Sequence, residues 1–137
     1  MAATYKQFGD RTTSRADIAW TSAADGTATV ATKHLNGKIS RVTFDSAHSG
    51  GTQPTNNYDV TLTDEHGYDL LAAGGANRSN AAATTVIPAA STTVIDGLTV
   101  TVTNSSPPVV DGVITVNVTN GGNAKSGTVY VYFDPVC

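Results

Sequence analysis

Short runs of alternating apolar and polar residues, separated by turn-forming residues, extend along most of the chain. The clearest is "YDVTLT" at 58–63, in which Tyr58, Val60 and Leu62 alternate with three polar residues. A period of two is typical of a β-strand with one buried face. Comparable runs lie at 16–23, 27–35, 38–45, 84–88, 91–103, 112–119 and 127–133. The pattern predicts an all-β fold, an antiparallel β-sandwich or barrel of about eight or nine short strands.

Turn-forming dipeptides divide the first strands. Asp25-Gly26 and Asn36-Gly37 are typical of tight hairpins, so the sequence predicts a three-stranded meander over residues 16–45. Ile39 is out of phase with Val42 and Phe44, which predicts a β-bulge near Ser40 or Arg41.

The apolar positions of these runs also predict the core. We expect ten side chains to lie between the packed layers: Ile18, Trp20, Val42, Phe44, Val60, Leu62, Val100, Val116, Val131 and Phe133.

The first fifteen residues show no alternation. We interpret residues 1–15 as an extended N-terminal arm and residues 16–137 as a single β-sandwich domain. The arm carries two aromatic residues, Tyr5 and Phe8, and two arginines, Arg11 and Arg15. These four residues are candidates for contact with a neighbouring subunit, and a frayed terminus is the alternative.

Composition limits the partners. The 137 residues carry a net charge of -3, and the eight Lys and Arg residues form no basic stripe, so nucleic-acid binding is not expected. No apolar stretch has the length of a signal peptide or a membrane span, so we expect synthesis in a cytoplasm and no membrane partner. The single cysteine, Cys137, either stays free or pairs between chains.

The stretch "VTLTDEHGYDLL" at 60–71 concentrates titratable groups. Asp64, Glu65, His66 and Asp69 are compatible with a divalent cation site or with zinc, which needs three or four ligands. We favour a solvated hairpin turn between two strands, with Gly67 at positive φ. The chain has no Gly-x-Ser-x-Gly motif and no phosphate-binding glycine loop. We therefore expect no catalytic residues, no metal, no cofactor and no enzyme activity.

The last run, "GTVYVYF", places Tyr130 and Tyr132 on the face opposite Val129, Val131 and Phe133. Aromatic residues are enriched where subunits meet, so this second face is a candidate oligomer interface. Core packing on both faces and a sugar-binding platform are the alternatives.

Three stretches resemble small virion structural proteins of tailed bacteriophages. They are "ATYKQFGDRTTSRADIAWTS" near the start, Arg41 to Asn80, and the closing "AKSGTVYVYF". The resemblance implies a capsid decoration, or cement, protein that bridges head-shell subunits and contacts the major capsid protein. It also implies location on the head surface of a virion assembled in a bacterial host. Arm residues 1–15 and the loop 46–57 would supply the contacts, through a homo-oligomer for which we favour a trimer over a dimer.

A different class of protein offers the alternative. A carbohydrate- or receptor-binding β-sandwich of a phage fibre or adhesin would present aromatic side chains on one exposed surface. The candidates for such a platform are Trp20, Tyr58, Tyr68, Tyr130 and Tyr132. A cement protein is expected to bury most of them.

Overall fold

The computed structural model describes residues 3–8, 13–46, 52–88, 90–95, 99–106 and 108–135. Nine strands lie in these ranges: β1 (Thr4–Phe8), β2 (Thr13–Thr21), β3 (Ala28–Asp45), β4 (Asp59–Thr63), β5 (Thr84–Val86), β6 (Ala90–Ile95), β7 (Thr99–Ser106), β8 (Val109–Thr119) and β9 (Ser126–Pro135). All named strand pairs are antiparallel, so the predicted all-β antiparallel fold is confirmed. No helix in these ranges is long and apolar enough to cross a membrane.

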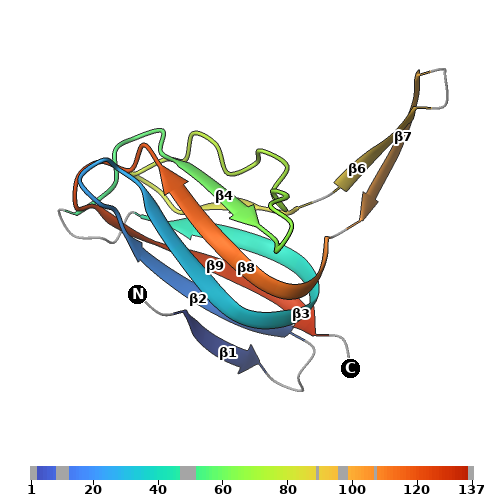
Figure 1. Ribbon diagram of the computed structural model, residues 1–137, viewed down its shortest axis with the longest axis horizontal. Helices are drawn as coiled ribbons and strands as arrows, with labels where there is room; N and C mark the ends of the chain where they lie inside the picture. Colours follow the sequence, from blue (N-terminus) through green and yellow to red (C-terminus); the bar gives the residue numbers. More distant parts are fainter. Residues whose placement is uncertain are drawn as a thin grey trace.

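Strand β3 organises the main sheet. The order is β1-β2-β9-β3-β8-β4, with β5 also paired to β3 and with β6-β7 as a separate pair (Figure 1). Residues 28–38 of β3 pair with β8, and residues 37–45 pair with β9. Gly37 lies opposite Val110 on one side and Pro135 on the other. The hairpin predicted at Asn36-Gly37 is therefore wrong, because ladder hydrogen bonds on both sides of the strand outweigh a local turn preference.

The predicted meander is also wrong. A turn does form at Asp25-Gly26, where Gly26 has a φ of 84° and its amide donates to the Ala23 carbonyl at 3.0 Å. The strands on either side of this turn are not paired, however, because β9 lies between β2 and β3. Strand β9 thus lies next to β2, where the predicted meander would have placed β3.

Bulges let the long strand keep its apolar residues inside. The register of β3 against β9 shifts between Ile39 and Arg41, as the sequence predicts, and Ile39, Val42 and Phe44 are all buried. A second shift occurs between Ala31 and His34 against β8. There the Thr32 hydroxyl accepts the Ile114 amide hydrogen at 3.1 Å, which supplies a partner that the interrupted ladder does not.

The sheet curls around one core but does not close into a barrel. Trp20 on β2 and Tyr58 just before β4 belong to opposite parts of the strand order, yet their ring centroids are 5.7 Å apart. Nine of the ten predicted core residues are buried, each with at most 9% of its surface exposed. The tenth, Val100, lies in β7, whose side chains are outside the described part.

The N-terminal segment differs from the expected arm. Residues Thr4–Phe8 form β1 and pair in antiparallel register with residues 13–17 of β2 in the same chain. Arg15 is consequently a residue of β2, which begins before the expected domain boundary at 16. Arg11 and Cys137 lie outside the described residues.

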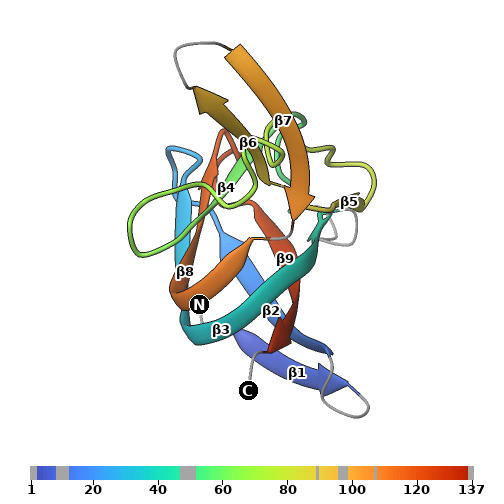
Figure 2. The same ribbon diagram turned by 90° about the vertical axis from the view of Figure 1, so that its right-hand side faces the viewer.

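The two outermost strands in the strand order, β4 and β1, have different surroundings. At the β4 end, segment 68–78 folds back over the strand: the Val60 amide donates to Gly75, Leu70 donates to Leu62, and Arg78 donates to Tyr58, at 2.7–2.8 Å. A strand was expected to resume over residues 68–71 after the turn, but these residues form an isolated bridge at Asp69 and then turns. At the other end, β1 is the outermost strand. Hairpin β6-β7 projects away from the body of the molecule (Figures 1 and 2).

We predict that Phe44→Ala lowers the free energy of unfolding by about 3–5 kcal/mol, because it leaves a cavity in a closely packed core. Phe44 is 1% exposed, whereas Thr119 at the end of β8 is exposed and serves as the control. Thr119→Ala should change stability by no more than about 0.5 kcal/mol in the same urea titrations. A near-neutral result for Phe44→Ala would contradict the core assignment.

Candidate functional site

Three of the residues predicted to mediate contacts come together on the outer face of the sheet. Arg15 lies opposite Tyr132, and Asp17 lies opposite Tyr130, across the β2-β9 ladder. Arg41 of β3 flanks Tyr132 from the other side. We call this surface the Arg–Tyr face and define it as Arg15, Asp17, Arg41, Tyr130 and Tyr132. Because side chains alternate along strands, these residues point away from the core that Ala16, Val42 and Val131 enter.

The two tyrosine rings are covered by guanidinium groups. The Arg41 guanidinium carbon lies 4.0 Å from the Tyr132 ring centroid, and that of Arg15 lies 5.8 Å from it. Arg15 is also 5.1 Å from the centroid of Tyr130. Cations at these distances are attracted by the ring quadrupole. Tyr132 is therefore held between two arginines from two different strands.

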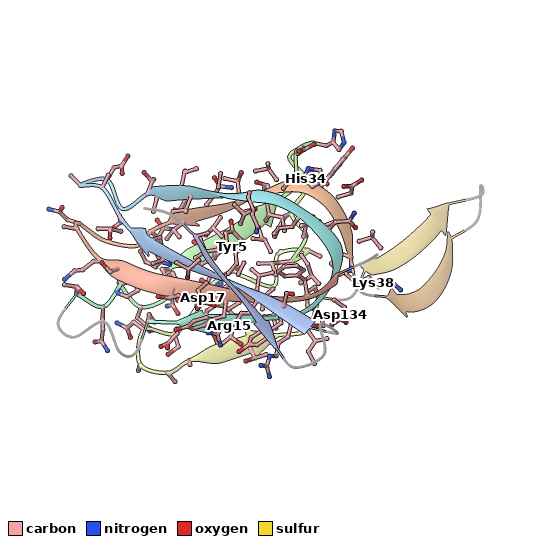
Figure 3. All side chains as sticks on the ribbon, turned by 90° about the horizontal axis from the view of Figure 1, so that it is seen from below. Tyr5, Arg15, Asp17, His34, Lys38 and Asp134 are labelled. Atoms are coloured by element: carbon pink, nitrogen blue, oxygen red, sulfur yellow. The ribbon has the colours of Figure 1, made fainter. Side chains whose placement is uncertain are left out.

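A carboxylate fixes the position of Arg15. Asp17 Oδ1 accepts from Arg15 Nε at 2.5 Å, and Oδ2 accepts from Nη2 at 3.0 Å (Figure 3). Both side chains are largely covered, at 18% and 17% exposure. A two-point contact of this kind sets the orientation of the guanidinium plane as well as its place. The hydrogen bond with Asp17 raises the pKa of Arg15 above its ordinary value.

The two tyrosines differ in acidity although they are neighbours on one strand. Burial raises the pKa of Tyr130, and the negative charges of Asp45 and Asp17 raise it further. Burial also acts to raise the pKa of Tyr132, but its contacts with Arg15 and Arg41 outweigh burial and lower it. The difference follows from the position of the two cations around Tyr132.

This arrangement suits contact with another protein. Tyrosine and arginine are the residue types that most often dominate the binding energy of protein interfaces. The face is ordered before any partner arrives, so little side-chain freedom remains to be lost on binding. The guanidinium groups already occupy ring faces on which a sugar would stack, which makes the surface a poor carbohydrate platform.

Arg41 was not among the residues predicted from the sequence to mediate contacts. Its outward orientation depends on the bulge between Ile39 and Arg41, and its neighbour Tyr132 is far away in the sequence. The bulge was predictable from the phase of Ile39, but the pairing of β3 with β9 was not.

The predicted contact residue Tyr5 lies elsewhere. Its hydroxyl accepts the Lys33 amide hydrogen at 2.8 Å, and Lys33 Nζ lies 4.3 Å from the ring centroid. The Lys33 amide falls in the second bulge of β3, so Tyr5 completes its hydrogen bonding. Phe8 belongs to β1, but its side chain is outside the described part, as is all of Arg11.

Residues 64–67 form a turn, as predicted, although no strand follows it at residues 68–71. Asp64 Oδ1 accepts the amide hydrogens of His66 at 2.9 Å and Tyr68 at 3.0 Å, and Gly67 has a φ of 84°. Glu65 Oε1 accepts the Val113 amide hydrogen of β8 at 3.0 Å. Across the ranges that the structure describes, no three His, Cys, Asp or Glu residues are grouped so as to hold a metal ion.

Asp69 organises the segment that covers β4. Its Oδ1 accepts the amide hydrogens of Leu62 and Leu71, both at 3.1 Å, and its Oδ2 accepts that of Ala73 at 2.9 Å. One carboxylate thus satisfies three backbone donors in a stretch with no regular ladder. The acidic residues of this region have structural roles in the turns.

Comparison with known proteins identifies no relative in sequence: no family model matches the chain, and no curated protein matches it. Among solved structures, one similar chain is a periplasmic lysozyme inhibitor of g-type lysozyme from Aeromonas hydrophila, PliG. The identity is 10%, the match covers 93% of this chain and 90% of that one, and the TM-score is 0.35. At this TM-score the similarity supports no conclusion about function.

We predict that Asp69→Ala lowers the free energy of unfolding by about 1–3 kcal/mol, because it leaves backbone amides without an acceptor. Asp69→Asn is the matched control, since its remaining carbonyl oxygen can still serve Leu62 and Leu71. It should recover part of the loss in the same denaturant titrations. Equal stability of both variants and the parent protein would show that water replaces the carboxylate.

We predict that Tyr132 ionises at lower pH than Tyr130. Ultraviolet absorbance of the phenolate should show that Tyr132→Phe removes the early phase of the alkaline titration, whereas Tyr130→Phe removes a late one. A lowered folded-state pKa means that the unfolded chain binds more protons between that value and the ordinary value of 10.0. The stabilising effect of Tyr132 should therefore grow as pH rises through this window and be lost as pH falls. The reverse order of titration would contradict the proposed stacking.

Proposed function

We propose that this chain is a bacteriophage virion structural protein that decorates the head shell and bridges its subunits. In this role it contacts the major capsid protein, acts as a homo-oligomer for which a trimer is favoured, and has no enzymatic activity. It is made in the cytoplasm of the bacterial host and carried on the outer surface of the head.

The observation that supports this proposal best is the Arg–Tyr face. Five residues from three strands form a prearranged surface of the kind that anchors one protein on another. Arg41 is exposed at its edge, while Arg15 is held by Asp17. A decoration protein needs a rigid contact surface of this type, because many identical copies must dock in one orientation.

The positions of the aromatic residues favour an assembly role over a fibre or adhesin. Trp20 and Tyr58 are each 1% exposed and belong to the core. Tyr130 and Tyr132 are partly buried beneath arginines. Tyr68 is 71% exposed but stands alone among the aromatic residues whose side chains are described. One exposed ring does not make the multi-residue platform that a sugar-binding domain requires.

Binding to heads that lack the protein tests the proposal. We predict that Arg41→Ala and Tyr132→Ala each weaken occupancy, with an increase in the half-saturating concentration of about 30-fold for a residue that dominates the contact. Tyr132→Phe keeps the ring and removes the hydroxyl, so it distinguishes the contribution of the ring to binding from that of the hydroxyl. Lys125→Ala is the matched control, since it removes a cation from the turn between β8 and β9.

Two outcomes would contradict the proposal. Failure of the intact protein to bind heads, with recovery in a tail or fibre fraction, would replace it with the fibre or adhesin role. Equal binding by the intact protein, Arg41→Ala and Tyr132→Ala would remove the Arg–Tyr face from the contact. Melting temperatures of all variants must match that of the parent, so that a loss of binding is not a loss of folding.

A further inference from the structure

Hairpin β6-β7 has no strand partner other than itself within the described part of the chain. Its register places Val94 opposite Val100 and Thr92 opposite Val102, and neither strand contains a charged residue. A two-stranded hairpin is at best marginally stable alone in water. Uncharged strands with unpaired outer edges are also templates for addition to another sheet.

The base of the hairpin is apolar. Ile87 precedes it and Val109 follows it, and these side chains are 75% and 66% exposed. They are two of the three large hydrophobic residues that are exposed in the described part of the molecule. A partner that docked against the hairpin would remove both from water.

Apart from the β4 edge, two described strands of the sheet pair on one side only, the three-residue β5 and the five-residue β1, and β1 offers the longer edge to an incoming strand. The β4 edge is occupied by segment 68–78, as the hydrogen bonds of Val60, Leu70 and Arg78 show. At the opposite end of the sheet, β1 pairs with β2, and no described strand lies on its other side. Strand addition at such an edge provides main-chain hydrogen bonds to the incoming segment.

Tyr5 of β1 also lines a cavity of about 340 Å³, together with residues of β2, β3 and β9. Tyr5, Leu35 and Phe133 form its apolar lining, while Lys33, His34 and Asn36 contribute its polar part. Leu35 and Phe133 are otherwise buried, at 4% and 9% exposure. A branched apolar side chain carried by an incoming strand would find a site here next to the ladder it joins.

The hairpin lies apart from β1: it projects at the top right of Figure 1 while β1 runs along the lower side of the body, and Figure 2 shows the two at top and bottom. A chain therefore does not pair its own hairpin with its own β1. We propose that hairpin β6-β7 of one copy adds to the β1 edge of a second copy, with an apolar side chain of the donor in the cavity lined by Tyr5, Leu35 and Phe133.

The charge on β1 favours this head-to-tail contact over pairing of two β1 strands. Lys6 is the central residue of β1, so antiparallel pairing centred on two copies of the strand would bring two lysines opposite each other. The uncharged hairpin causes no such repulsion. A contact between two different surfaces forms a closed ring when the rotation between copies permits, which is compatible with a trimer.

Two complementary variants test the proposal, both in a Cys137→Ser background that excludes an interchain disulfide. Replacing residues 90–106 by a short Gly-Ser linker removes the donor, and deleting residues 2–9 removes the acceptor. Light scattering after size-exclusion chromatography should show an oligomer for the parent and a monomer for each variant. An equimolar mixture of the two variants should give a 1:1 dimer that does not grow, because one donor and one acceptor remain.

Hydrogen exchange provides a second measurement, in case the β1 deletion fails to fold. Amides of Thr4–Phe8 should exchange at least about 10-fold more slowly in the parent oligomer than in the hairpin-deleted protein. Equal exchange, a monomeric parent, or an oligomer that survives hairpin deletion would each overturn the proposal. If the parent is a monomer and deletion of the hairpin abolishes binding to heads, the hairpin contacts the head shell and not a second copy. Head binding by the hairpin-deleted monomer would leave the proposed function intact, so the two hypotheses can fail separately.

Discussion

The rest of the structure depends on the hydrogen bonding of β3 along both of its edges. One half of this 18-residue strand pairs with β8 and the other half with β9, and the two ladders overlap at Gly37. The strand must therefore bend while remaining paired, and the bend turns one sheet into a curled enclosure around a single core. The same strand carries Arg41 to the side of Tyr132. The packing of the core and the geometry of the Arg–Tyr face thus follow from one set of backbone pairings.

Local pattern was sufficient to predict nine of the residues that are buried. Alternation alone identified Trp20, Phe44 and Leu62, and the phase of Ile39 identified a bulge. Alternation reports how a side chain is oriented relative to its own strand, and it does not depend on the neighbouring strand. Strand order does depend on the neighbour, so it was not predictable. Asn36-Gly37 has the sequence of a tight turn, yet it lies within a strand because two distant segments pair with it.

For the same reason, only part of the candidate site was predictable from the sequence. The period of two placed Tyr130 and Tyr132 opposite the core-facing valines, and this orientation is confirmed by their partial exposure. Their arginine neighbours come from β2 and β3, so no window of sequence contains the cluster. Arg15 was proposed as part of an arm because its segment lacks alternation. Its role became evident only through the β2-β9 register.

Side chains supply acceptors for backbone amides at several places where a ladder is interrupted or ends. Thr32 and Tyr5 do so at one bulge of β3, Asp69 beside β4, and Glu65 beside β8. This explains why a chain with few charged residues concentrates carboxylates in one stretch. Unpaired amides at bulges and turns need acceptors, and a carboxylate offers two oxygens. The chemistry that first indicates a metal site is used here to complete the backbone hydrogen bonding.

The central position of β9 has a consequence for how the protein folds during synthesis. β2 and the second half of β3 leave the ribosome well before the strand that joins them, because β3 ends at Asp45 and β9 begins only at Ser126. Residues up to 135 must therefore leave the ribosome before the inner sheet can assemble. Contacts so distant in sequence are typical of slow folding, in milliseconds to seconds, and leave unpaired strands exposed in the meantime. A nascent chain that stalls before β9 would thus be a target for chaperones or proteases, and truncation of the last strand would be far more damaging than its length suggests.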